Sequence, residues 1–185
     1  MLRWDGFGRS LGFAALAALG VPVATTFGAP LLGSVTSAEL YLVAVAGVYV
    51  AGLCPGRSRR VAALAMATLA GLVLAALPLG LAGTALGAAG IVAVGRSGIA
   101  WRQPGLRGPA IEALLGGAGL LVASVLATGG LLALCLAVWG YFLVQSAYFL
   151  IGGRAPRRDA PARDPFEVAR ARLERLLEED PDPSR

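Results

Sequence analysis

Histidine and lysine are both absent from the 185 residues, and all sixteen basic residues are arginine. Without histidine the chain has no ligands for a bis-histidine haem or a histidine-bound copper ion, and no histidine general base. Without lysine it cannot form a Schiff base with retinal or pyridoxal phosphate. The composition therefore predicts that the protein uses no such cofactor, and we expect none.

Cysteine is scarce as well, with only Cys54 and Cys135. A disulfide framework or a zinc site needs more cysteines at closer spacing. The two thiols are expected near opposite ends of different helices, too far apart to pair. We expect Cys54 to react with reagents from the cytoplasmic side, and Cys135, if it reacts, only from the outside.

Charged residues make up only 15% of the chain, whereas 57% are hydrophobic and the mean hydropathy is +0.72. This balance is outside the usual range of soluble proteins and indicates that the surrounding solvent is a lipid bilayer. Several apolar runs are long enough to cross about 30 Å of hydrocarbon at about 1.5 Å per residue. We therefore predict an all-α integral membrane protein, a bundle of six transmembrane helices. The predicted spans are 11–27, 39–54, 61–77, 79–95, 109–127 and 130–151.

The connections between these spans alternate in arginine content, which predicts the orientation of the bundle. Four segments carry arginine and three carry none. The positive-inside rule then places all four basic segments, and both termini, in the cytoplasm of a bacterial inner membrane. These arginines are also expected to attract anionic lipid headgroups, at about 1 kcal/mol each, so no nucleic-acid partner is needed to explain them. They are Arg3, Arg9, Arg57, Arg59, Arg60, Arg96, Arg102, Arg107, Arg154, Arg157, Arg158 and Arg163.

Two segments leave alternatives open. Residues 77–83 read as a tight turn or as a kink within one helix; the turn is favoured, because residues 61–95 as a single helix would be about 50 Å long. The first span could also be a cleaved signal peptide, since arginines precede its apolar stretch. Neither Pro22 nor Phe27 suits the small-residue cleavage pattern, which favours a retained span.

The domain organisation changes abruptly after residue 151. Residues 1–10 form a short cytoplasmic segment, 11–151 the membrane domain, 152–163 a basic linker rich in proline and alanine, and 164–185 a cytoplasmic helix and tail. Asp164, Pro165 and Glu167 mark the start of this amphipathic helix. Its apolar face suits either a protein partner bound through 164–180 or contact with the membrane surface. The partner-binding residues of that face are Phe166, Leu173, Leu176 and Leu177.

Polar residues within the spans are the candidates for a ligand site. Glu39 and Glu112 lie at predicted span ends, so a hydrated carboxylate at a helix N-terminus would explain both. Alternatively, Glu112 points into the bundle as a gate or a substrate ligand. Tyr141, Gln145 and Tyr148 share one face of the last span, where they would line a small cavity or form interhelical hydrogen bonds.

Glycines at spacings of three and four residues predict a close-packing face on the fourth span. We expect this face to pack within one chain rather than between copies. Its members are Gly80, Gly83, Gly87 and Gly90.

Together these patterns favour a non-enzymatic membrane subunit or assembly factor that docks a partner through its C-terminal helix. A small transporter, or the substrate-binding membrane component of one, is the alternative, tested by changing Glu112 or Gln145. An intramembrane enzyme acting on lipid is disfavoured, because no paired nucleophile and base occur in the spans.

Overall fold

The computed structural model of the chain describes residues 6–77, 79–100 and 107–151, together with Arg170 and Glu174. Within these residues every regular element is a helix, and six helices are long and apolar enough to cross a membrane. This confirms the predicted all-α class. The elements are α1 (Phe7–Leu32), α2 (Ser34–Leu53), α3 (Arg57–Ala76), α4 (Gly80–Val94), the π-helical turn η1 (Gly95–Ala100), α5 (Arg107–Leu126), α6 (Gly130–Ser146) and α7 (Tyr148–Ile151).

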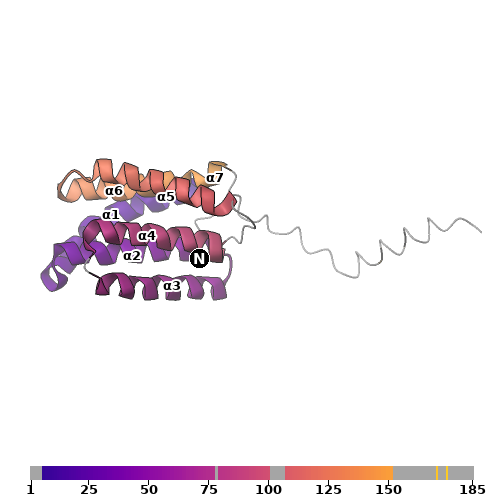
Figure 1. Cartoon of the computed structure of the whole chain (residues 1–185), viewed down its shortest axis with the longest axis horizontal. Coiled ribbons are helices and arrows are strands. Elements are labelled where there is room, and N and C mark those ends of the chain that lie inside the picture. The colour runs from indigo at the N-terminus through magenta and orange to yellow at the C-terminus, as the bar shows by residue number, and fades with distance from the viewer. Residues whose placement is uncertain (1–5, 78, 101–106, 152–169, 171–173, 175–185) are drawn as a thin grey trace, which may run out of the picture. The chain divides into compact units, whose positions relative to one another are not determined.

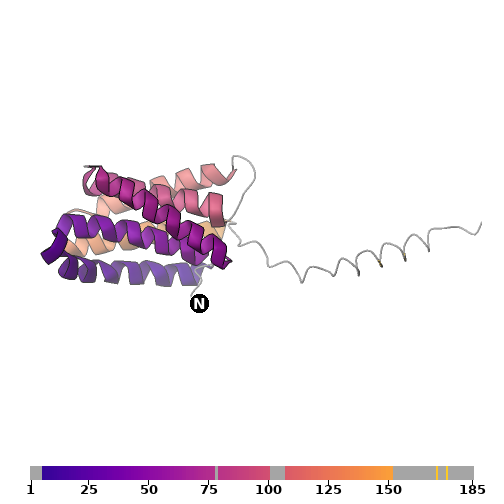
Figure 2. The ribbon, with the colours of Figure 1, turned by 90° about the horizontal axis from the view of Figure 1, so that it is seen from below.

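Helix α2 is the central helix of the bundle, with α1, α3 and α4 packed around it. Helix α6 packs against α1 and α5, while α3 lies at the edge (Figure 1). A second view shows the helices running side by side along one direction (Figure 2). The burial follows this arrangement, since α2 has the largest share of buried residues and α3 one of the smallest.

The connection between the first two spans is much shorter than the sequence predicts. The predicted loop at 28–38 is wrong, because α1 continues to Leu32 and α2 begins at Ser34. Gly33 alone reverses the chain, with φ of +83°, a conformation that glycine adopts without strain. The Ser37 hydroxyl then donates to the Gly33 carbonyl oxygen over 2.7 Å and fixes this turn.

Helix α1 accommodates Pro22 and Pro30 within its length. The Thr25 hydroxyl donates to the carbonyl oxygens of Val21 and Pro22, a common way of stabilising a helix next to proline. From α2, the Tyr41 hydroxyl donates to a carbonyl oxygen of α1, that of Ala17. The two helices are therefore joined by a hydrogen bond as well as by apolar packing.

The segment between α3 and α4 is a turn and not a kink. Helix α3 ends at Ala76, and α4 begins at Gly80, whose φ of +64° again requires glycine. The favoured interpretation of residues 77–83 is therefore confirmed.

Among the four glycines predicted to form a packing face on α4, one lies close to a side chain of another helix. A Cβ atom added to Gly87 would clash with Leu74 of α3, so this glycine does allow close packing between helices. At Gly83 the clash would be with Leu79, just before the same helix, and at Gly80 and Gly90 an added Cβ would meet nothing within 4 Å. Of the four predicted packing glycines, Gly87 is therefore the one at which α4 approaches α3 closely.

The chain divides into two compact units, residues 1–153 and 154–185. In the second unit, Arg170 and Glu174 are helical, and their side chains form an exposed ion pair of 3.0 Å one turn apart. The linker at 152–163 and the predicted partner-binding residues lie outside the described residues. Those residues are Phe166, Leu173, Leu176 and Leu177.

Candidate functional site

Arg96 lies inside the bundle, although the sequence places it in a cytoplasmic loop. It is the second residue of η1, and its side chain is 0% exposed. The loop prediction is wrong because the helix does not end at Gly95; it widens into a π-helical turn that continues through Ile99 and Ala100. Short π-helical insertions of this kind often occur at functional sites.

Glu112 of α5 is the charged partner of Arg96. The Nε and Nη2 atoms of Arg96 each donate to one carboxylate oxygen of Glu112 over 2.6 Å. This two-pronged arrangement is the strongest geometry for an arginine and a carboxylate. Glu112 is 6% exposed and is the sixth residue of α5, so it is not a hydrated carboxylate at a helix N-terminus.

Gln145 of α6 is a further polar partner of Arg96. Its Oε1 atom accepts a hydrogen bond of 2.9 Å from Arg96 Nη2, and its Nε2 atom donates to the Leu115 carbonyl oxygen over 3.1 Å. The ring of Tyr148 covers the guanidinium, with its centroid 4.2 Å from Cζ. The predicted residues Glu112, Gln145 and Tyr148 thus meet at Arg96, and these four residues are called the Arg96 cluster below.

Three aromatic rings from three helices pack beside this cluster. Phe13 of α1, Tyr49 of α2 and Phe142 of α6 have ring centroids 5.1 to 5.2 Å apart. Ser10 and Tyr49 share a buried hydrogen bond of 3.1 Å. None of these residues was predicted as a site residue, because nothing in the sequence of an apolar helix indicates which aromatic residues face one another. They form an aromatic wall beside the Arg96 cluster.

Tyr141 is the one predicted ligand residue that stays out of the cluster. Its ring packs edge-on against Phe142, with centroids 5.2 Å apart, and lies so close to Gly119 that an added Cβ would be 2.9 Å from Tyr141 Cδ2. Among the described residues, its buried hydroxyl has no hydrogen-bond partner. An unpaired buried hydroxyl costs about 1–3 kcal/mol, which marks this position as one where a further polar group would be favourable.

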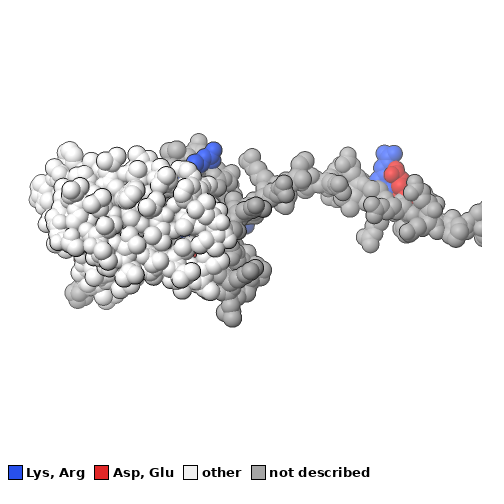
Figure 3. All heavy atoms as spheres, turned by 90° about the horizontal axis from the view of Figure 1, so that it is seen from above, with Lys and Arg blue, Asp and Glu red and all other residues white. Residues whose placement is uncertain are grey.

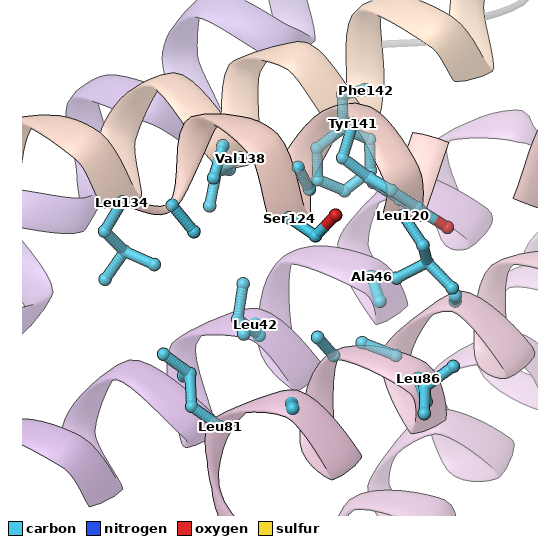
Figure 4. Close-up of a pocket in the computed structure, with 17 residues that line it drawn as sticks. Leu42, Ala46, Leu81, Leu86, Leu120, Ser124, Leu134, Val138, Tyr141 and Phe142 are labelled. Carbon is cyan, nitrogen blue, oxygen red and sulfur yellow. The ribbon is translucent and has the colours of Figure 1, made fainter. Parts of the chain in front are cut away.

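An apolar cavity of about 520 Å³ lies between α2, α4, α5 and α6, and Figure 4 shows side chains from both walls around this space. Alanines form much of the wall, and their small side chains leave the space between the helices unfilled. The hydroxyl of Ser124, which lines this cavity, donates to the Leu121 carbonyl oxygen over 2.8 Å. The lining comprises Leu42, Ala46, Leu81, Ala82, Ala85, Leu86, Ala88, Ala89, Leu120, Ala123, Ser124, Ala127, Leu134, Ala137, Val138, Tyr141 and Phe142.

Within the bundle, the arginines whose side chains the structure describes gather at one end, called the arginine end below. Arg9 lies near the start of α1 and Arg57 at the start of α3. Both helices begin at the end of the bundle where α4 runs into η1. On the face shown in Figure 3, the blue of arginine appears at this end, and the rest of the described bundle is white. The Arg96 cluster lies just inside the arginine end, whereas the apolar cavity extends toward the opposite end, past Leu81 and Ala127.

Cys54, which directly follows α2, is buried with 0% exposure, so the predicted cytoplasmic reactivity does not fit its surroundings. Burial raises the pKa of the Cys54 thiol, and the nearby charges of Arg59 and Arg60 lower it by a smaller amount. Fewer molecules then carry the reactive thiolate at neutral pH than in an exposed cysteine. Slow reaction at this thiol follows from its burial and says nothing about which side of a membrane it faces.

No group of three or more cysteine, aspartate, glutamate or histidine side chains that could hold a metal ion occurs among the described residues. Comparison of the chain with protein-family models, with curated proteins and with solved structures finds no match.

Proposed function

We propose that the chain is a multi-pass protein of the bacterial inner membrane with both termini in the cytoplasm. Six apolar helices of sufficient length support insertion. The gathering of arginines at one end supports the orientation, because basic segments are retained on the cytoplasmic side.

We propose further that the bundle is a small carrier, or the substrate-binding membrane component of one, and that it holds a neutral, largely apolar small molecule. The apolar cavity carries this proposal. Its volume of about 520 Å³ falls within the roughly 300–1,000 Å³ that is typical of ligand sites. No charged residue lines it, so a charged substrate would lose its hydration without compensation.

The Arg96 cluster suits the role of a closed gate at the arginine end. It joins η1, α5 and α6 through charge-assisted hydrogen bonds, and the aromatic wall adds contacts to α1 and α2. A substrate that leaves the cavity toward this end would have to part these groups. A ligand can drive such a change only by binding the open state more tightly than the closed state.

Photolabelling of the full chain in lipid nanodiscs with a small uncharged aryl diazirine tests this proposal. The cavity-lining residues Ala137 and Val138 are both 4% exposed, so a lipid-dissolved probe reaches them only by entering the cavity. We expect both to be labelled, and we expect most of that labelling to be lost in Ala85→Phe and in Ala123→Phe, which fill the cavity from opposite walls.

Ala62→Phe is the matched control, because Ala62 is exposed on α3 and lines neither this cavity nor the other one described below. Labelling at Ala137 and Val138 should persist in this variant. If the wild-type protein is labelled at lipid-exposed leucines but not at these two residues, the cavity does not admit small apolar molecules and the proposal fails.

A second candidate is the membrane subunit or assembly factor, without catalytic activity, that the sequence favours. The helical residues Arg170 and Glu174 of the second unit and their ion pair support a docking helix there. In this proposal residues 164–180 bind a protein partner. Purification in mild detergent of the full chain and of a chain ending at residue 153 tests it: a partner should accompany only the full chain.

A further inference from the structure

A second cavity, of about 230 Å³, lies between α2, α3 and α4 at the end of the bundle opposite the arginine end. It is called the Glu39 pocket below, after the carboxylate in its wall. Thr36 on α2 and Thr84 on α4 add two hydroxyls to the same lining. It shares no lining residue with the apolar cavity, so the two sites are independent.

Glu39 is in a different position from the one that the sequence predicts. The sequence places it at the outer start of a span, where the helix dipole and water would stabilise the carboxylate. In the structure α2 begins at Ser34, so Glu39 is the sixth residue of the helix, half-buried and facing the pocket. The favourable effect of the dipole fades within the first turn and does not account for a charge at this depth.

No positive charge among the described residues compensates Glu39. Its carboxylate forms neither an ion pair nor a hydrogen bond with the side chains that the structure describes. The arginine end begins beyond Leu53, about 21 Å away along α2 at 1.5 Å per residue. At that distance none of the arginines of the bundle that the structure describes can form an ion pair with Glu39, so a cationic ligand is free to pair with this carboxylate.

The size and lining of the pocket indicate which cation fits. One carboxylate and two hydroxyls fall short of the six to eight oxygen ligands that calcium takes, and magnesium on one carboxylate is usually held by substrate phosphates as well. The volume of about 230 Å³ corresponds to roughly eight waters at about 30 Å³ each, far more than a bare ion fills. Leu40, Val43 and Leu74 make the rest of the wall apolar. A ligand that matches both the carboxylate and the apolar wall of the pocket has a positively charged group and a short hydrocarbon chain.

We propose that the Glu39 pocket binds a small primary amine in its protonated form. An ammonium group has three N–H donors, and the pocket offers three acceptor groups: the Glu39 carboxylate and the hydroxyls of Thr36 and Thr84. The alkyl part lies against the leucine and valine side chains. This inference does not depend on the carrier proposal, and either can fail without the other.

Equilibrium dialysis of radiolabelled n-butylammonium against the full chain in nanodiscs tests this inference, with empty nanodiscs as background. We expect saturable binding by the wild-type protein, and no competition from n-butanol, which has the same chain without the charge. Glu39→Gln should raise the Kd roughly tenfold to a hundredfold, as expected for the loss of a hydrogen bond to a charged group. Thr84→Val should raise it by less.

Thr26→Val is the matched control, because Thr26 is exposed on α1 and outside the pocket. It should bind as tightly as the wild-type protein. Ala75→Leu, which narrows the pocket and leaves its charge in place, should also weaken binding and makes the test independent of how well Glu39→Gln folds. Equal Kd values for wild type and Glu39→Gln, equal competition by butanol, or no saturable binding at all would each overturn the inference.

Discussion

Replacement of Arg96 by methionine is expected to lower the free energy of unfolding by about 3–5 kcal/mol, because it leaves the Glu112 carboxylate buried without its countercharge. The same change also removes a donor from Gln145 Oε1 and the cation above the Tyr148 ring. Glu112→Leu should have an effect of similar size, since it leaves the guanidinium unpaired. Titration of each variant with a denaturing detergent in mixed micelles measures the loss.

The double variant Arg96→Met with Glu112→Leu shows how much of the loss in stability comes from leaving one charge buried without its partner. It should be more stable than either single variant, because apolar side chains of similar volume often replace a buried pair with little loss. Arg57→Met is the control for losing an exposed arginine, and it should change stability by about 0.5 kcal/mol or less. Single variants as stable as this control would contradict the buried pair.

Replacement of Gly95 by alanine is expected to destabilise the bundle by about 1–3 kcal/mol through overpacking. An added Cβ would overlap Val50 Cγ1 of α2 and lie 2.8 Å from Cγ2. Val50 is fully buried and its branched side chain has little freedom to turn away, so the backbone of η1 must shift instead. That shift would also move the neighbouring Arg96 away from its partners.

Gly90→Ala is the matched control on the same helix. An added Cβ there meets no atom within 4 Å, so this variant should be neutral or more stable by up to about 1 kcal/mol from the higher helix propensity of alanine. Both values come from the same unfolding measurement. Equal stabilities of the two alanine variants would show that α2 and η1 are further apart than described.

Hydropathy and length were enough to predict the six helices, because both are local properties of the chain. The turn before Gly80 was also predictable, since one helix over residues 61–95 would be too long. The connection at 28–38 was not. Its residues include Pro30 and small polar side chains typical of loops, yet all of them except Gly33 are helical.

Three of the four residues of the Arg96 cluster could be predicted from the sequence, and the fourth, Arg96, could not. Glu112, Gln145 and Tyr148 could be predicted because polar residues in an apolar helix are costly unless they have a partner. Arg96 was assigned to a loop by its charge alone. The sequence does contain a signal against that assignment, because the apolar residues Ile99 and Ala100 follow it and allow the helix to continue.

The two cavities could not be read from the sequence. Each depends on how far apart alanine-rich and glycine-containing helix faces come to lie, and this distance is set by contacts elsewhere in the bundle. Tyr141 illustrates the limit: its helical face was predicted, but its unpaired hydroxyl beside Gly119 depends on the approach of α5 to α6.

Closure of the arginine end by the Arg96 cluster is tested most directly by the accessibility of Ser146, which follows Gln145 and is fully buried. The measurement is the reaction rate of Ser146→Cys with a charged, membrane-impermeant methanethiosulfonate, in nanodiscs and with Cys54 and Cys135 replaced by alanine. Arg57→Cys serves as the exposed reference. We expect Ser146→Cys to remain unmodified until Arg96→Met is added, which should open it to the reagent. A Ser146→Cys rate equal to that of Arg57→Cys, with Arg96 in place, would contradict a closed arginine end.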